Sequence, residues 1–119
     1  MAGPVIRRGE IWRVRFDPSI GGEIRKKIRK TRPAVIVSNN HWNSNNNRVQ
    51  VVPLTSSEKR LFLFEAHVMV RGRQNKAMAD QIRTVAKERM GDKIGQVTID
   101  EMMAIEKAIR VQLDLNQYR

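Results

Sequence analysis

The alternation of hydrophobic and polar side chains predicts short strands along most of the chain. In residues 10–16, Trp12, Val14 and Phe16 alternate with Ile11 and two arginines, and a period of two is typical of a strand with one buried face. We therefore expect Trp12 in the core. Further segments have the apolar, β-branched composition of strands, and they are 33–38, 49–54, 62–70 and 77–84.

The last part of the chain has the period of a helix instead. Thr98 and Glu101 match a capping box, in which each side chain accepts a hydrogen bond from the other residue's backbone N–H. Apolar residues that follow the cap fall on one helical stripe, and they are Met102, Ile105, Ile109 and Leu113. We expect this stripe to pack against the strands.

Together these elements predict a mainly β (α+β) fold, a small barrel-like sheet with one C-terminal helix, as a single domain over residues 1–119. The tract 39–47, rich in Asn and Ser, is expected as a polar loop. Because no apolar run approaches the roughly 20 residues of a membrane span, no membrane contact is expected. The chain has no cysteine, which suits a reducing compartment, and a cytoplasmic protein is the simplest expectation.

The charge changes the picture, because it points to a polyanionic partner. The chain holds 23 Lys and Arg against 12 Asp and Glu, a net charge of +11. Residues 1–60 hold 13 basic and 4 acidic side chains, a net +9, whereas residues 61–119 hold 10 and 8, a net +2. A field this one-sided suits nucleic acid, through phosphate contacts and release of counterions.

The sequence offers little for metal-dependent or histidine-dependent cleavage of nucleic acid. The four carboxylates of the basic half show no metal-ligand spacing, so neither a metal nor another cofactor is expected, although carboxylates that converge in the fold stay an alternative. His41 and His67 are the two histidines, and nothing in the sequence pairs them for acid–base work.

Hydroxyl and guanidinium groups suit a different reaction, in which RNA supplies its own nucleophile. The 2′-hydroxyl attacks the adjacent phosphate without a bound water or metal, provided that donors stabilise the charge on the phosphate oxygens. Arginine suits that task because its planar fork stays protonated and binds phosphate bidentately. Loss of one preorganised donor of this kind typically costs on the order of 10²–10³ in rate.

Short motifs in a fixed order carry a family resemblance over most of the chain, from about residue 8 to residue 115. They are Arg8-Gly-Glu-Ile-Trp12, Asp17-Pro18, Gly22-Glu23, Arg32-Pro-Ala-Val-Ile-Val-Ser38, Val52-Pro-Leu-Thr-Ser56, Asp80-Gln-Ile-Arg-Thr84 and Ile94-Gly95. Each is weak alone, but the whole series resembles the MazF/PemK family of toxin endoribonucleases.

The resemblance implies an SH3-like small β-barrel with a C-terminal helix, in a homodimer. It also implies metal-independent cleavage of single-stranded RNA at short sequences, with 2′,3′-cyclic phosphate and 5′-hydroxyl ends. A cognate antitoxin with an acidic tail would neutralise the chain.

The same resemblance assigns catalytic roles to three residues. Arg32 matches the family's catalytic arginine, Thr55 its catalytic threonine, and Glu23 the acidic residue proposed as general base. The simpler alternatives are a surface cation for Arg32, a strand-ending hydroxyl that bonds its own turn for Thr55, and a loop ion pair for Glu23.

The resemblance also implies a groove that binds RNA beside these catalytic residues, and further residues are expected to line it. They are Arg25, Lys26, Lys27, Arg29, Lys30, Ser38, Asn39, Ser56, Gln81 and Arg83. Gln81 could form hydrogen bonds with a base edge, and Arg83 could bind a phosphate. The alternative is a structural ion pair between Asp80 and Arg83. Residues 27–30 look like an insertion relative to the family, so base preference does not transfer. Trp42 suits stacking on a base or covering of the barrel.

Two other functions compete with the ribonuclease. One is a non-catalytic gyrase-binding toxin of the same fold that resembles CcdB, and the other is an SH3-like protein that coats nucleic acid. The combination of Arg32, Thr55 and Glu23 favours the ribonuclease over both.

Overall fold

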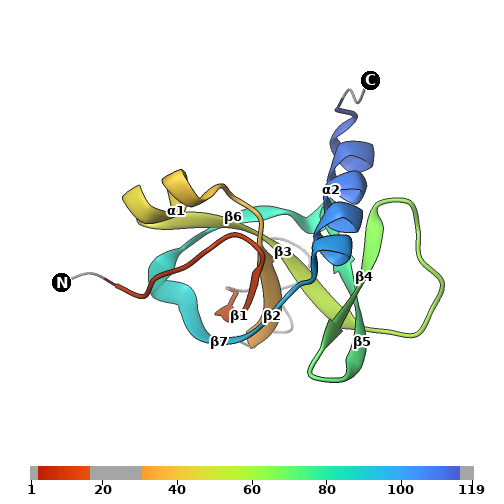
Figure 1. Cartoon of the computed structure of the whole chain (residues 1–119), viewed down its shortest axis with the longest axis horizontal. Coiled ribbons are helices and arrows are strands. Elements are labelled where there is room, and N and C mark those ends of the chain that lie inside the picture. Colours follow the sequence, from red (N-terminus) through yellow and green to blue (C-terminus); the bar gives the residue numbers. More distant parts are fainter. Residues whose placement is uncertain (1–2, 17–30, 116–119) are drawn as a thin grey trace, which may run out of the picture.

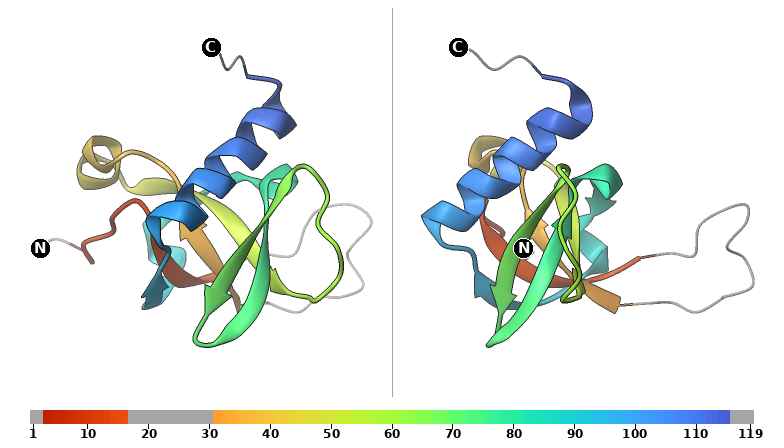
Figure 2. Two further views of the ribbon diagram at one scale, coloured as in Figure 1. Left: turned by 45° about the vertical axis from the view of Figure 1, so that its right-hand side comes forward. Right: turned by 90° about the vertical axis from the view of Figure 1, so that its right-hand side faces the viewer.

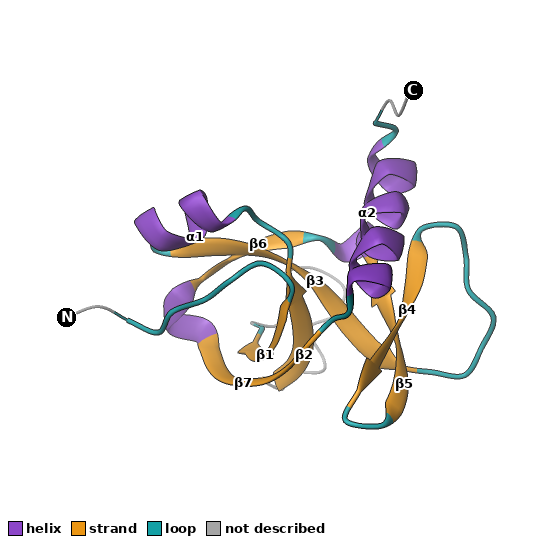
Figure 3. Cartoon of the chain, viewed as in Figure 1, coloured by secondary structure: helices purple, strands orange, loops and turns teal. Residues whose placement is uncertain are grey.

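A computed structural model of the chain describes residues 3–16 and 31–115. Within these ranges a strongly curved antiparallel sheet is combined with one long helix (Figures 1 and 3). The elements in chain order are β1 (Glu10–Arg15), β2 (Thr31–Ile36), α1 (Asn40–Asn45), β3 (Arg48–Ser56), β4 (Glu65–Val70), β5 (Arg73–Met78), η2 (Ala79–Gln81), β6 (Arg83–Ala86), η3 (Lys87–Arg89), β7 (Met90–Gln96) and α2 (Ile99–Leu113).

The long strand β3 organises the sheet, because it pairs with three other strands. The strand order is β4-β5-β3-β2-β1-β7, and β6 also pairs with β3. On one side of β3 lies β2, while the other side is shared, with Val51 opposite Arg83 of β6 and Leu54 opposite Ala77 of β5. The chain therefore curls into a half-barrel from which the β4–β5 hairpin extends (Figure 2).

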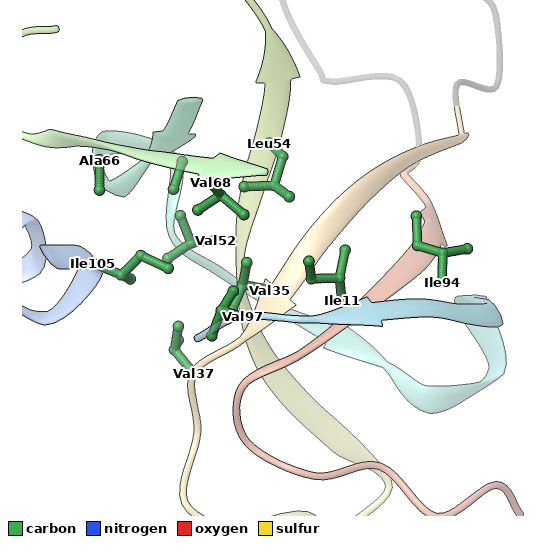
Figure 4. Close-up of a cluster of buried hydrophobic side chains, with 11 residues drawn as sticks. Ile11, Val35, Val37, Val52, Leu54, Ala66, Val68, Ile94, Val97 and Ile105 are labelled. Atoms are coloured by element: carbon green, nitrogen blue, oxygen red, sulfur yellow. The ribbon is translucent and has the colours of Figure 1, made fainter. Parts of the chain in front are cut away.

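The core is divided into two clusters on opposite faces of the sheet. One cluster lies within the curl of the barrel and includes Trp12, Val14 and Phe16, so the expected burial of Trp12 is confirmed. The other lies between the sheet and α2, where Ile105 of the helix points toward Val52 (Figure 4). The predicted mainly β fold with a C-terminal helix is confirmed.

The first strand is buried on both faces, contrary to the prediction of one. Ile11, on the face opposite Trp12, is 1% exposed and belongs to the cluster beneath α2. The reason is that β1 lies between β2 and β7, and Ile11 packs in a cluster that includes Val35 of β2, Ile94 of β7 and Ile105 of α2.

The helix α2 begins at its predicted cap and is fixed to the rest of the fold at several points. The Thr98 hydroxyl accepts a hydrogen bond from Glu101 N at 3.0 Å, and Glu101 Oε1 accepts one from Thr98 N at 2.9 Å, which confirms the capping box. Arg8 Nη2 lies 2.5 Å from Glu106 Oε2. Leu113, at the end of the predicted stripe, is 48% exposed, because the last turn of the helix projects beyond the sheet (Figure 1).

Three segments differ from the sequence-based prediction in their secondary structure. The Asn-rich tract contains the short helix α1, which begins after Asn39 because that side chain accepts from Trp42 N at 2.8 Å. The predicted strand 77–84 is divided between β5 and β6 by the turn η2, since the two parts pair with different halves of β3. The strand β7 was not predicted. No helix in the described ranges is long and apolar enough to cross a membrane.

Candidate active site

An open cleft of about 460 Å³ collects basic and hydroxyl side chains from several strands. Its polar lining consists of Arg13 from β1, Thr31 and Arg32 from β2, Thr55 and Ser56 from β3, and Arg71, Arg73 and Asn75 from the β4–β5 hairpin. Leu54, Val70 and Ile94 supply apolar lining. The cleft lies where the half-barrel meets the hairpin.

Two of the three predicted catalytic residues are brought together by the pairing of β2 with β3. The pairs between these strands end with Ala34 opposite Pro53, and Arg32 and Thr55 each lie two residues beyond that pair on their own strand. Both side chains line the cleft, and both are partly buried. Because both residues continue directly from paired strands, the sheet positions the guanidinium and the hydroxyl at the same cleft.

The charge of the cleft suits an anion rather than a metal ion. Four guanidinium groups line it, and among the described residues one of the four forms an ion pair, which joins Arg13 Nε to Asp92 Oδ1 at 3.5 Å. Its described lining contains no carboxylate and no histidine. Residues 3–16 and 31–115 also contain no group of three His, Cys, Asp or Glu that could hold a metal ion. Guanidinium and hydroxyl donors are what phosphate binding requires.

A buried ion pair lies behind Thr55 in the sheet. Lys76 lies directly opposite Thr55 in the register of β3 and β5, and Lys76 Nζ is 3.0 Å from Glu65 Oε1, with side chains only 7% and 10% exposed. Lys76 Nζ also donates to the Arg60 carbonyl at 3.2 Å, and Glu65 Oε1 accepts from Phe62 N at 3.0 Å. These bonds anchor the segment that follows β3 against the β4–β5 hairpin. That segment continues directly from the strand that carries Thr55.

A second buried carboxylate stabilises the edge formed by β1 and β7. Glu10 accepts hydrogen bonds from Arg7 N at 2.8 Å and Trp12 Nε1 at 2.9 Å, and it lies 3.1 Å from Lys93 Nζ. Burial raises the pKa of Glu10, but the bonds from Trp12, Arg7 and Lys93 together outweigh burial, so its pKa lies below the ordinary value of 4.5. This edge carries Arg13 and Ile94 into the cleft.

Several predicted site residues lie outside the described residues. These are the proposed base Glu23 and the RNA-binding cations Arg25, Lys26, Lys27, Arg29 and Lys30. The strands β1 and β2, which flank that segment in the sequence, contribute Arg13 and Arg32 to the cleft.

Two residues predicted to bind RNA do not reach the cleft and have structural partners. Ser38 is 7% exposed, and its hydroxyl bonds to Asn43 Oδ1 at 2.5 Å and accepts from Gln50 N at 2.9 Å. Asn39 uses its side chain to cap α1. Ser38 and Asn39 therefore connect α1 to β3, whereas Ser56 lines the cleft as expected.

Gln81 and Arg83 also lie away from the cleft lining. Gln81 Nε2 contacts Met78 Sδ at 3.6 Å, and the Arg83 guanidinium lies over the Phe16 ring at 4.8 Å from its centre. Among the described ion pairs none joins Asp80 to Arg83, so that structural alternative is not observed either.

The two histidines and Trp42 are placed apart from this site. His41 lies on α1 and His67 on β4, both exposed and on elements that do not pair with each other. Trp42 Nε1 donates to the Arg48 carbonyl at 2.9 Å, and the Arg48 guanidinium lies 5.9 Å from the Trp42 ring centre. Trp42 thus packs on the start of β3.

The sequence-based prediction missed five polar cleft residues, which are Arg13, Thr31, Arg71, Arg73 and Asn75. Only the hairpin left a local signal, because Arg71-Gly72 is a turn between two strand-forming runs. The others become neighbours through pairing of strands that are distant in the sequence.

Comparisons with known proteins identify the family of the chain. Residues 7–113 match the family model described as PemK-like, MazF-like toxin of type II toxin–antitoxin systems. The chain is 38% identical over 120 residues to the endoribonuclease MazF9 of Mycobacterium tuberculosis, an alignment that covers 93% of this chain and 98% of that protein.

Solved structures show the same fold. A mycobacterial endoribonuclease in complex with its cognate antitoxin is 28% identical, with a TM-score of 0.74, and the match covers 95% of this chain and 99% of that one. MazF from Deinococcus radiodurans superposes with a TM-score of 0.76 at 21% identity, covering 95% of this chain and 100% of that one.

Proposed function

Because the chain belongs to the PemK-like, MazF-like toxin family, it is an endoribonuclease of a type II toxin–antitoxin system, and we propose that it cleaves single-stranded RNA in the cleft of Arg32 and Thr55. The observation that carries this assignment is the register of β2 and β3. It brings the two strands together just before Arg32 and Thr55, which both line a cleft whose described lining is cationic and free of carboxylates.

The proposed reaction is an internal transfer within the RNA chain. The 2′-oxygen attacks the adjacent phosphorus, so that a bond from the 2′-oxygen to phosphorus forms while the bond to the 5′-oxygen breaks. The 2′-hydroxyl gives its proton to a base and the leaving 5′-oxygen takes up a proton from water, so the products carry a 2′,3′-cyclic phosphate and a 5′-hydroxyl. In this scheme Arg32 binds two phosphate oxygens through its fork, and the Thr55 hydroxyl donates to one of them.

A base is required near the 2′-hydroxyl, and the described lining of the cleft contains none. We assign that role to Glu23, which lies outside the described residues. A glutamate is ordinarily ionised at neutral pH and can accept a proton. The four guanidinium groups of the cleft suit the phosphate.

We further propose that an acidic antitoxin segment neutralises the chain by occupying the same cleft. The cationic lining that suits RNA also suits Asp and Glu side chains. We propose a homodimer as the active form, since α2 leaves apolar side chains exposed, among them Met103, Val111 and Leu113. The cytoplasm, which contains the RNA substrates, is the proposed site of action.

The function is tested with a long single-stranded RNA, incubated with the protein in EDTA, followed by mapping of the cut ends. We expect discrete cuts with 5′-hydroxyl and 2′,3′-cyclic phosphate ends, and no cut where the 2′-hydroxyl next to the cleaved bond is replaced by hydrogen. Intact RNA across many sequences, together with inhibition of gyrase, would instead support the non-catalytic alternative.

A further inference from the structure

We propose that the tip of the β4–β5 hairpin is a second phosphate-binding site, in which Arg71 and Arg73 hold an RNA phosphate next to the scissile one. The inference rests on the proposed function, because it takes the cleft to bind RNA. It adds a binding site to the two residues that act on the cleaved bond.

The position of the hairpin follows from its register. Val70 of β4 pairs with Arg73 of β5, so the turn between them consists of Arg71 and Gly72 alone. Arg71 and Arg73 line the same cleft as Arg32, but on the hairpin rather than on the half-barrel. A strand of RNA bound at Arg32 therefore has a second cationic surface beside it.

The backbone of the turn is unfavourable for the residue that occupies it. Both turn residues have positive φ angles, 49° at Arg71 and 81° at Gly72. Such a turn requires left-handed backbone at both positions, for which Asn-Gly is the preferred pair. Arginine carries a steric cost there that asparagine largely avoids, so this residue is not the one that stability alone would select.

The side chain of Arg71 is also held in a way that leaves its fork available. Nε of Arg71 donates to the Ile94 carbonyl on β7 at 3.3 Å, which anchors the guanidinium over the cleft. Within residues 3–16 and 31–115 its two terminal amino groups have no hydrogen-bond partner, and neither Arg71 nor Arg73 forms an ion pair. An anchored guanidinium with free amino groups is suited to an incoming phosphate.

Substitution of Arg71 separates this role from a structural one. Arg71→Asn removes the charge but relieves the backbone, so the variant is expected to unfold at or above the wild-type Tm. Arg73→Gln removes a charge from the strand without altering the turn. Lys107→Gln, an exposed cation on α2 outside the cleft, is the matched control for the loss of one charge.

The measurement is the Kd for a short 2′-O-methyl oligoribonucleotide over a series of salt concentrations, with the full chain. This probe carries the phosphates of RNA but has no free 2′-hydroxyl and is not cleaved. We expect Arg71→Asn and Arg73→Gln each to weaken binding about fivefold. Each should also make the plot of log association constant against log salt concentration less steep by about 0.7, the value for one phosphate contact on a single strand.

Wild-type affinity and slope in both variants would overturn the inference, as would an equal loss in Lys107→Gln. Weakened binding of polyglutamate without a change for the oligonucleotide would show that the hairpin recognises an acidic peptide instead, and would also overturn it. Because the probe is uncleavable, the result is independent of catalysis. A wild type that cuts no RNA but shows the expected slopes would refute the proposed function and leave the second phosphate site intact.

Discussion

Arg32 and Thr55 line one cleft, and each lies two residues beyond the Ala34–Pro53 pair of two adjacent antiparallel strands. Neither residue lies near the other in the sequence, so their proximity is a property of the sheet. It places a planar cation and a hydroxyl on one wall of a cleft and gives the proposed transition state two donors from rigid elements.

The fork of Arg32, rather than its charge alone, should matter for the reaction. Arg32→Lys keeps the positive charge but loses the two parallel donors, so we expect single-turnover cleavage to fall by about 10². Binding of the uncleavable oligonucleotide should change by less than about threefold, since a lysine still attracts phosphate. Cleavage within about twofold of wild type would show that charge suffices.

The Thr55 hydroxyl is expected to act as a donor in the transition state. Thr55→Val has nearly the same shape without the hydroxyl and should lower the rate of cleavage by about 10². Thr55→Ser keeps the hydroxyl and serves as the control, with a rate within about tenfold of wild type. Equal rates for the valine and serine variants would remove Thr55 from the chemistry.

The Lys76–Glu65 pair is expected to stabilise the hairpin and the strand that carries Thr55. Lys76→Met leaves the Glu65 carboxylate buried without its cation, at a cost of about 3–5 kcal/mol in the free energy of unfolding. The double variant with Glu65→Gln should recover part of that loss, because no unpaired charge remains. Urea denaturation measures the free energy of unfolding of the single and the double variant. Lys107→Met, which replaces an exposed lysine, is the control. A single variant as stable as wild type would contradict this role.

Glu10 should make stability depend on acid. Its folded pKa lies below its ordinary value of 4.5, so its contribution to stability is fully present above that value and is lost as pH falls through the lower folded pKa. Glu10→Gln places an amide against Lys93 and should cost about 1–2 kcal/mol at pH 7. The difference in free energy of unfolding between variant and wild type, measured by urea denaturation, should become smaller below pH 4.5. A gap that does not change with pH would show that this carboxylate is not the titrating group.

Local signals in the sequence were sufficient where one segment determines its own structure. The start of α2 was predicted because the Thr98–Glu101 capping box is complete within four residues. Burial of Trp12 followed from the period-two pattern of its strand. The strand β7 was missed because its polar, glycine-containing sequence has no such pattern, and it forms by pairing with β1.

The candidate site was predictable to the extent that the family resemblance marks it. That resemblance supplied Arg32, Thr55 and Ser56, all of which line the cleft. It did not indicate Arg71 and Arg73, which reach the cleft because a two-residue turn folds the hairpin toward it. Ser38 was expected to bind RNA, but the structure buries it against Asn43. This contact could not be predicted, because Asn43 lies on a helix in a segment that was expected to be a loop.

The most direct test of the central claim is single-turnover cleavage of one identified RNA site by wild type, Arg32→Ala and Arg48→Gln. Arg48 is a cation at the far end of β3, outside the cleft. The account predicts that Arg32→Ala lowers the rate by at least about 10² and remains folded, whereas Arg48→Gln cleaves within about threefold of wild type. Cleavage by Arg32→Ala at the wild-type rate would place the reaction elsewhere on the molecule.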